Sequence, residues 1–249
     1  MKVVFHEDFY QVYTADPAAA GGRIEAIVKV IEPFVEFIEA APATETDIQA
    51  AHDKAHIDDV RRQGLYPISA LAAGGAIQAA TLGLDTPSFG LIRPPGHHAS
   101  AESAWGFCFF NNMAIALMAL KKQKKIDSAY VLDIDLHYGD GTVNILEGQS
   151  WVNVHNMEAA TRRAYLDEIT AEMAHCQTDI IAISAGFDNH QDDWGGLLST
   201  DDYRKIGKMV KEAAGRCGGG CFAILEGGYN HKVLGHNIKA LLDGLSGDL

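Results

Sequence analysis

The chain has 249 residues, of which 47% are apolar and 21% charged, so it is long enough to fold as one large domain around its own core. Its formal net charge of −13 disfavours unaided binding to nucleic acid or to an anionic membrane, because both require a basic surface. The same acidic balance mildly favours cationic ligands.

Strand-like and helical patterns alternate along the chain, and this alternation is typical of a parallel sheet with crossover helices. Between residues 22 and 60 we expect two or three surface helices, broken at Pro33 and Pro42 and with a cap-like segment at Thr44–Asp47. In chain order, the other expected elements are strands at Val3–His6 and Phe89–Arg93, a helix at Asn112–Lys122, strands at Ala129–Asp135 and Trp151–His155, a helix at Ala160–His175, a strand at Asp179–Ser184, a helix at Asp202–Gly215, a strand at Cys221–Glu226 and a helix at Lys232–Leu245. We therefore predict an α/β fold: a three-layer open parallel sheet with helices on both faces, forming a single domain over residues 1–249.

The cysteines and the N-terminus indicate a reduced, non-membrane environment. Four cysteines are scattered without zinc-ribbon spacing or the density of a secreted scaffold. The chain starts directly with a strand-like run rather than a signal peptide, and no stretch approaches membrane-spanning length. We expect a cytoplasmic protein.

Polar clusters follow four of the predicted strands. In open parallel sheets, ligands bind beyond the carboxyl ends of the strands, so these clusters should converge on one crevice. The clusters are Arg93–His98, Asp133–His137, Ala185–Asp188 and Glu226–Tyr229.

Asp135 and His137 are two residues apart at a strand end, so both side chains point to one face, which Asp133 shares. Asp188, after a neighbouring strand, would complete an Asp-His-Asp ligand set with an open position, the arrangement of a catalytic zinc site. Taken alone, the Asp-x-Asp-x-His pattern could equally cap turns or bind a structural ion, and Asp188 could cap a helix. Their combination favours a hydrolase's metal site.

Two histidines and a tyrosine supply further candidate chemistry. His97 and His98 follow Pro94 and Pro95, and each imidazole can pair with a carboxylate, so that one can deprotonate a water. Tyr229 follows two glycines at a strand end and could donate a hydrogen bond to an oxyanion, although it could also be an ordinary half-buried tyrosine. The isolated histidines receive no role; they are His52, His56, His175 and His236.

Five runs of these residues resemble, in order, the signature blocks of the histone deacetylase superfamily, and the resemblance extends from about residue 5 to residue 245. It implies the arginase/deacetylase fold and a deacetylase that hydrolyses linear amides. The runs are Arg93–Ala99, Gly106–Asn112, Asp133–Gly141, Ala185–Asp188 and Glu226–Asn230.

The resemblance implies one Zn²⁺, or Fe²⁺ as in some members, bound by Asp135, His137 and Asp188. A structural K⁺ is a further expectation, with Asp133 and Asp135 as contributors; Asn153 stands where several relatives use a serine for it. The metal would polarise the amide carbonyl and lower the pKa of its water.

The resemblance also implies the catalytic roles. His97 would pair with Asp133 as an electrostatic partner, and His98 would pair with Asp140 and act as the general base and acid. Tyr229 would polarise the acyl carbonyl. The products would be a carboxylate, acetate being expected, and a free amine.

Phe107, with Gly106 beside it, matches the aromatic wall of an acyl-lysine tunnel, and Gly228 matches a glycine that lets the substrate pass closely. The chain is short between His155 and Asp179, where relatives carry a long loop and often a second aromatic wall. We therefore expect a wide pocket whose rim is open or built by a partner, including a second copy in a homo-oligomer.

The substrate stays open among acetyl-lysine in proteins, acetylated polyamines and other small acylamides. One alternative is a ureohydrolase on the same fold. That class needs carboxylates at the first and third positions of the later motif for a two-metal site, but here His190 follows Asp188 two places on. The second alternative, a catalytically silent acyl-lysine-binding protein, should have lost a ligand, the histidine pair or the tyrosine, and none is missing.

Overall fold

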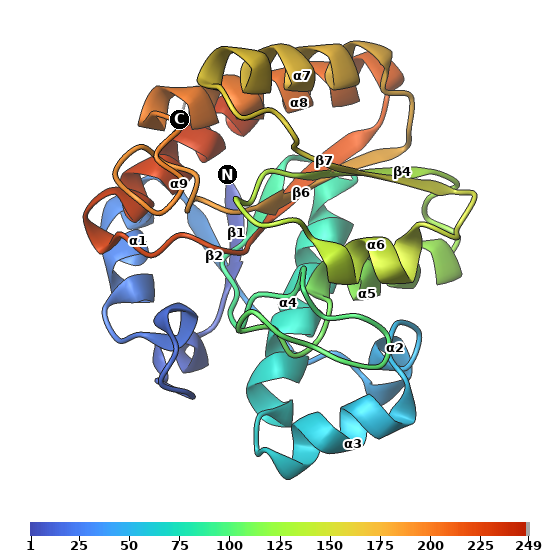
Figure 1. Ribbon diagram of the computed structural model, residues 1–249. Coiled ribbons are helices and arrows are strands. Elements are labelled where there is room, and N and C mark those ends of the chain that lie inside the picture. Colours follow the sequence, from blue (N-terminus) through green and yellow to red (C-terminus); the bar gives the residue numbers. More distant parts are fainter. Residues whose placement is uncertain (248–249) are drawn as a thin grey trace.

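A computed structural model, which describes residues 1–247, shows an all-parallel sheet of seven strands within that range (Figure 1). The strand order is β2-β1-β3-β7-β6-β4-β5. The strands are β1 (Lys2–Phe5), β2 (Glu36–Glu39), β3 (Ser88–Gly90), β4 (Ala129–Asp133), β5 (Val152–Asn156), β6 (Ile180–Ala185) and β7 (Gly220–Leu225).

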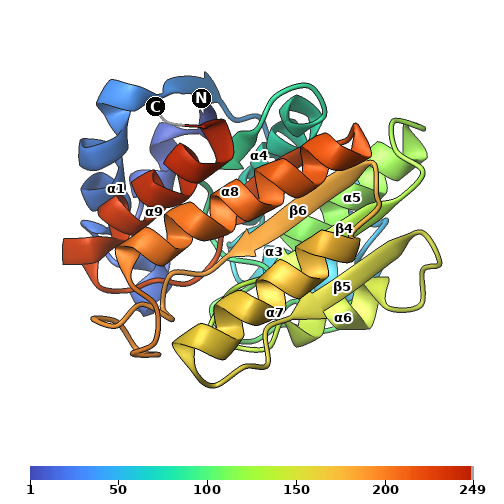
Figure 2. The ribbon, with the colours of Figure 1, turned by 90° about the horizontal axis from the view of Figure 1, so that it is seen from above.

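Helices cover both faces of the sheet. In Figures 1 and 2, one layer holds α1, α7, α8 and α9, and the other holds α4, α5 and α6, with α2 and α3 beyond α4. The α-helices are α1 (Arg23–Ile31), α2 (Glu45–Ile48), α3 (Lys54–Arg62), α4 (Tyr66–Gly83), α5 (Asn112–Lys122), α6 (Asp140–Leu146), α7 (Arg162–His175), α8 (Thr200–Cys217) and α9 (His231–Ser246), and three short 3-10 helices lie at Glu7–Tyr10, Pro17–Ala19 and Glu32–Phe34.

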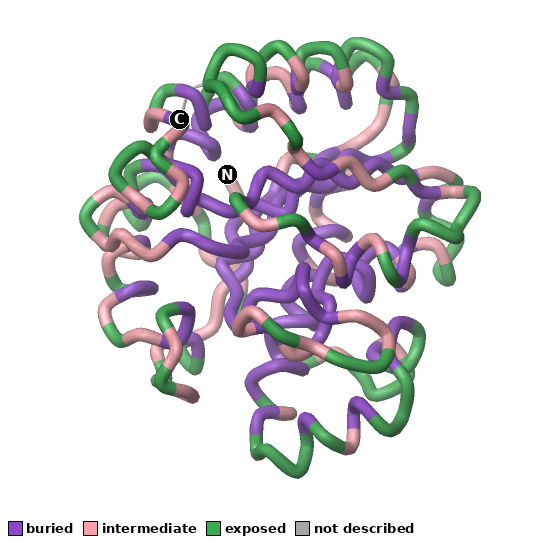
Figure 3. The backbone as a smooth tube through the Cα atoms, viewed as in Figure 1, coloured by how far each residue is buried: buried purple, intermediate pink, exposed green. Residues whose placement is uncertain are grey.

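The core consists of two apolar layers, one on each face of the sheet. Successive residues of a strand point to opposite faces, so Val131 of β4 packs in the α4–α5 layer and Leu132 in the α8–α9 layer. Both side chains are fully buried, as expected for a parallel sheet covered on both sides. Figure 3 shows that buried residues are concentrated in the middle of the molecule. The predicted three-layer α/β fold is confirmed.

Most predicted elements match within one or two residues, but the region 22–60 is partly wrong. It contains the strand β2 as well as helices. In this short edge strand, Glu36–Glu39, two adjacent apolar residues lie between two exposed glutamates, so the sequence shows no alternation that would predict a strand. The capping box at Thr44 and Asp47 is present. Of the described helices, none is long and apolar enough to cross a membrane.

The sheet also fixes the location of the site. The four strands that are followed by polar clusters, β3, β7, β6 and β4, are consecutive neighbours in the sheet. Because all strands are parallel, the loops that leave them start from the same edge.

Candidate active site

The strand-end loops bring Asp135, His137 and Asp188 together, as the sequence predicts. Nδ1 of His137 lies 3.1 Å from Oδ1 of Asp135 and 3.1 Å from Oδ2 of Asp188. One ligand atom from each residue lies within 4.8 Å of the others, and this is the one such group found among residues 1–247. Both carboxylates are buried, while His137 is partly exposed and faces a cavity.

The surroundings of this group fit a divalent cation. Oδ2 of Asp188 is buried and accepts no hydrogen bond from the described part of the chain. Burial, together with the nearby Asp135 carboxylate, raises the pKa of Asp188 to about 6. Gly227 keeps room for the ligands, since a Cβ there would lie 2.6 Å from Oδ2 of Asp135 and 2.8 Å from Oδ2 of Asp188. Two buried carboxylates and an imidazole around one point form a donor set that zinc accepts.

The two adjacent histidines each pair with a carboxylate. Nδ1 of His97 lies 3.1 Å from Oδ2 of Asp133, and Nδ1 of His98 lies 2.7 Å from Oδ1 of Asp140. Burial alone would lower the pKa of His97, but the carboxylates of Asp135 and Asp133 outweigh it and raise that pKa well above its usual range. Burial and the adjacent His97 lower the pKa of His98 to about 4. At neutral pH His98 is therefore neutral, whereas His97 is held beside two buried carboxylates.

Two buried charged residues, Glu226 and Arg23, form hydrogen bonds with the backbone of these loops. Oε2 of Glu226 accepts the backbone N–H groups of Gly96 and His97, at 2.7 and 3.2 Å. The guanidinium of Arg23 donates to the carbonyls of Gly228 and Glu226, at 2.8 and 2.6 Å. Arg23 and the role of Glu226 were missed. Nothing in the local sequence distinguishes Arg23 from a surface residue at the start of a helix.

Tyr229 and Phe107 face each other in the cavity, with ring centroids 6.0 Å apart. The cavity measures about 110 Å³, and His97, His98, Gly106 and His137 also line it. Its glycine wall is Gly227 rather than the predicted Gly228. With φ at 114°, Gly228 lies against Leu234 and Phe187 instead.

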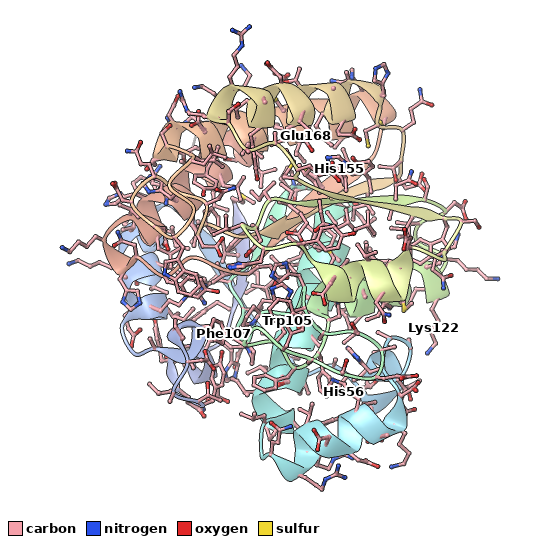
Figure 4. The ribbon with its side chains drawn as sticks, in the orientation of Figure 1. His56, Trp105, Phe107, Lys122, His155 and Glu168 are labelled. Carbon is pink, nitrogen blue, oxygen red and sulfur yellow. The ribbon has the colours of Figure 1, made fainter. Side chains whose placement is uncertain are left out.

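The cavity is small, about 110 Å³, so the expectation of a wide pocket is not met, while a rim completed by a partner stays a prediction. His155 hydrogen-bonds to Glu168 of α7 at 2.8 Å, so the chain passes from β5 into α7 through a short connection (Figure 4). The small cavity is instead bordered by Trp105 and Trp194, which come from two other loops. Both residues were missed, although Trp105 directly precedes the Gly106–Asn112 block.

Three other residues lie outside the cavity. Asn153 pairs with Tyr130, three positions before Asp133, and is exposed, so it does not lie beside the carboxylates proposed for K⁺. His52 and His56, which receive no catalytic role, are buried: His52 bonds to Ser100 and Asn111, and His56 bonds to Phe109.

Comparison with known proteins identifies the family. The sequence model described as the histone deacetylase domain matches residues 62–159 and 152–245. The chain belongs to the histone deacetylase family. The two matched pieces meet at residues 152–159, which agrees with the expected shortening after His155.

Individual relatives within the histone deacetylase family are distant but cover most of the chain. A probable deacetylase of Methanothermobacter thermautotrophicus is 28% identical over 99% of this chain and 91% of its own length. The histone deacetylase-like amidohydrolase of Pseudomonas aeruginosa is 26% identical over 93% of this chain and 78% of its own length. The crystal structure of the HDA15 HD domain, at 24% identity, superimposes with a TM-score of 0.85 over 99% of this chain and 89% of that one, which shows the same fold.

Proposed function

We propose that this protein is a zinc-dependent deacylase that hydrolyses the N-acyl amide of an amine. The observation that carries the proposal is that the Asp135–His137–Asp188 group, a neutral His98 and Tyr229 gather around one small cavity. A metal-binding group, a base and an oxyanion donor are the components that amide hydrolysis needs.

Asp135, His137 and Asp188 would hold the metal, with iron as the alternative to zinc. When bound, a divalent cation there would supply Lewis acidity and water acidified enough to react at neutral pH. The remaining steps belong to the protein's own side chains.

His98 suits the role of general base because it is neutral and its Nδ1 is fixed by Asp140, so Nε2 can accept a proton. The same nitrogen then returns the proton to the leaving amine. His97, whose Nδ1 is hydrogen-bonded to Asp133, serves as the electrostatic partner that stabilises negative charge developing beside it. The phenol of Tyr229 donates to the developing oxyanion, whose collapse breaks the C–N bond and gives a carboxylate and an amine.

Acetylated lysine and acetylated polyamines are the substrate classes we propose to test. The zebrafish relative is named a polyamine deacetylase, at 25% identity over 94% of this chain and 41% of its own length. The excess of acidic residues also favours an amine that carries a positive charge.

The test is turnover of an acetyl-lysine peptide, acetylputrescine and acetylspermidine by protein reconstituted with zinc or iron. Tyr229→Phe should lower kcat about 10²–10³-fold, as loss of an oxyanion donor does, and a chelator should abolish turnover. Tyr66→Phe is the matched control, because Tyr66 packs against Arg61 away from the cavity. Tight binding of one metal ion without hydrolysis of any amide would contradict the proposal.

A ureohydrolase is not favoured by the geometry. His190, which occupies the position where that class needs a carboxylate, lies 3.3 Å from the Thr200 hydroxyl and accepts the N–H of Asp192. It contributes to no metal-binding group among residues 1–247.

A further inference from the structure

Exposed apolar side chains are concentrated in the loops that leave the carboxyl ends of the strands. Within residues 1–247, six large apolar side chains are strongly exposed, and four of them come from loops that follow β3, β4 and β6. Such a concentration marks a binding surface rather than a random scatter. The four are Trp105, Leu136, Tyr138 and Trp194, of which the two tryptophans line the cavity itself.

Trp105 covers the His98–Asp140 pair. Its ring lies on the His98 imidazole with centroids 3.9 Å apart and planes 30° apart, and its Nε1–H donates to Oδ2 of Asp140 at 2.8 Å. Asp140 thus uses one oxygen for His98 and the other for Trp105. The indole therefore restricts both members of the pair.

A tight turn fixes Trp105 in this position. The N–H of Cys108 donates to the carbonyl of Trp105, and Gly106 and Phe107 between them both have positive φ, 59° and 69°. A Cβ on Gly106 would run into the His98 ring, so only glycine fits there. The turn directs the indole onto His98 and the Phe107 ring toward Tyr229. Figure 4 labels Trp105 and Phe107.

Trp194 makes the corresponding contact on the other side. Its ring stacks on Tyr229 with centroids 4.0 Å apart and planes 24° apart, and its edge meets the His137 ring at 6.0 Å. Each tryptophan thus contacts one of the groups assigned to catalysis and still exposes about half of its surface, 56% for Trp105 and 53% for Trp194. That free surface is available to a substrate.

We propose that Trp105 and Trp194 are the specificity walls of this site, which select an acylated amine whose chain is unbranched next to the amide nitrogen. A cavity of 110 Å³ holds roughly four waters at liquid density, about the volume of an acetyl amide and the first methylene group of the amine. Because both indoles line this small cavity, a branch on the carbon next to the amide nitrogen would have to displace one of them, whereas a straight methylene chain would not. The walls are also positioning residues, Trp105 for His98 and Trp194 for Tyr229. This inference rests on the proposed deacylase function.

The first test compares N-acetylputrescine with its analogue that carries one methyl group on the carbon next to the amide nitrogen. If the lysine peptide is the better substrate, the pair is that peptide and its analogue methylated on the corresponding carbon. The native protein should prefer the unbranched amide by about 30-fold in kcat/KM, a ratio typical of steric discrimination in a tight pocket. Trp105→Ala and Trp194→Ala should each reduce the preference to less than about 5-fold.

The second test separates positioning from wall formation. Trp105→Phe keeps a ring against His98 but loses the N–H that Asp140 accepts, so kcat should fall about 10-fold while KM stays nearly unchanged. Trp194→Phe keeps the stack on Tyr229 and should restore most of the kcat that Trp194→Ala loses, about 10-fold. Trp151→Phe is the matched control, since Trp151 packs near Lys121 outside the cavity.

In both alanine variants, a loss of activity that is equal for the two amides, and so leaves the preference unchanged, would indicate a merely structural role and would overturn the inference. Absence of turnover by the native protein would instead contradict the deacylase function. In that case tryptophan emission of the metal-free Trp151→Phe protein still tests the walls, because only Trp105 and Trp194 remain. A saturable change with the unbranched amide alone supports the inference, and an equal response to both amides, or none, overturns it.

Discussion

Asp193 shows how a single carboxylate fixes the loop that carries Tyr229. Its Oδ2 accepts the backbone N–H groups of Tyr229 and Asn230, at 2.8 and 2.7 Å. The Asn230 side chain in turn donates to the carbonyl of Asp192. The phenol's position therefore depends on a residue that need not touch substrate.

We expect Asp193→Ala to lower kcat about 10-fold and to leave KM nearly unchanged, because supporting partners of catalytic groups typically contribute at this level. Steady-state kinetics with the best acetylated amine measures it. Asp167→Ala, at an exposed position on α7, is the control and should be silent. A rise in KM with unchanged kcat would show that Asp193 serves substrate binding instead.

His52 makes the stability of the protein depend on pH. It donates from Nδ1 to the carbonyl of Ser100 and accepts the N–H of Asn111 at Nε2, so its neutral form already satisfies both partners. Burial, together with the neighbouring His56, lowers the pKa of His52 to about 4. Protonation at Nε2 would break the bond from Asn111, at the end of the loop that holds Trp105 and Phe107.

Because the folded pKa lies below the unfolded value of 6.5, the stabilisation from neutral His52 is complete above pH 6.5 and is lost as pH falls toward 4. The loss should reach about 2 kcal/mol by pH 5 and about 3 kcal/mol in all. Urea unfolding at pH 7.5 and pH 5 measures it. The His52→Gln protein should have a lower free energy of unfolding than the native protein at pH 7.5. Between pH 7.5 and pH 5, however, its free energy of unfolding should fall by about 2 kcal/mol less than that of the native protein. Equal losses in the two proteins would rule out His52 as the titrating group.

At the level of elements, α8 and α9 pack closely because of small residues at their contact. A Cβ on Gly207 of α8 would lie 2.5 Å from the carbonyl oxygen of Leu241 in α9. Near the end of the same helix, Gly215 has nothing within 4 Å of where its Cβ would be. One helix thus contains a glycine required by packing and a glycine that packing does not require.

The two substitutions to alanine should therefore have opposite signs. Gly215→Ala should stabilise by about 0.5–1 kcal/mol through helix propensity and reduced freedom of the unfolded chain. Gly207→Ala gains the same propensity but forces α8 and α9 apart, and should destabilise by about 1–3 kcal/mol. Denaturant unfolding of the two variants measures both effects. If both substitutions stabilise the protein, α8 and α9 can separate at little cost and the prediction is wrong.

The sequence predicts those elements in which the spacing of apolar residues reflects which sides are buried. α8 and α9 have one apolar face each, and β4, β6 and β7 are continuous apolar runs, so their periodicity is readable. α4 is buried on nearly all sides and is rich in alanine and glycine, so no face stands out. β2, at the sheet edge, has too few residues for a pattern. Both α4 and β2 therefore lack the periodic pattern of apolar residues from which an element can be predicted.

At the scale of the whole molecule, the sequence predicts those residues of the site that lie directly after strands. Asp135, His137 and Asp188 follow β4 and β6, and the rule for parallel sheets brings them together without further information. Trp105, Trp194 and Arg23 reach the same place only through long-range packing, which local patterns do not encode. The fold and the grouping of these three side chains are therefore predictable from the sequence, but the walls of the cavity are not.

Metal binding should be coupled to folding, because residues far apart in the sequence form the site. The buried carboxylates of Asp135 and Asp188 come from separate loops that only the folded sheet brings together, so the unfolded chain holds no comparable site. Zinc should therefore stabilise the whole molecule, by about 4 kcal/mol when free metal is 1,000-fold above Kd. Thermal unfolding with zinc and with a chelator measures the difference as a shift in Tm. Asp188→Asn should lose most of that shift and Asp167→Asn none of it, because the exposed Asp167 pairs only loosely with Arg163 at 3.6 Å. A shift that survives Asp188→Asn would mean that zinc binds elsewhere, and the cavity would then lack the metal that its chemistry requires.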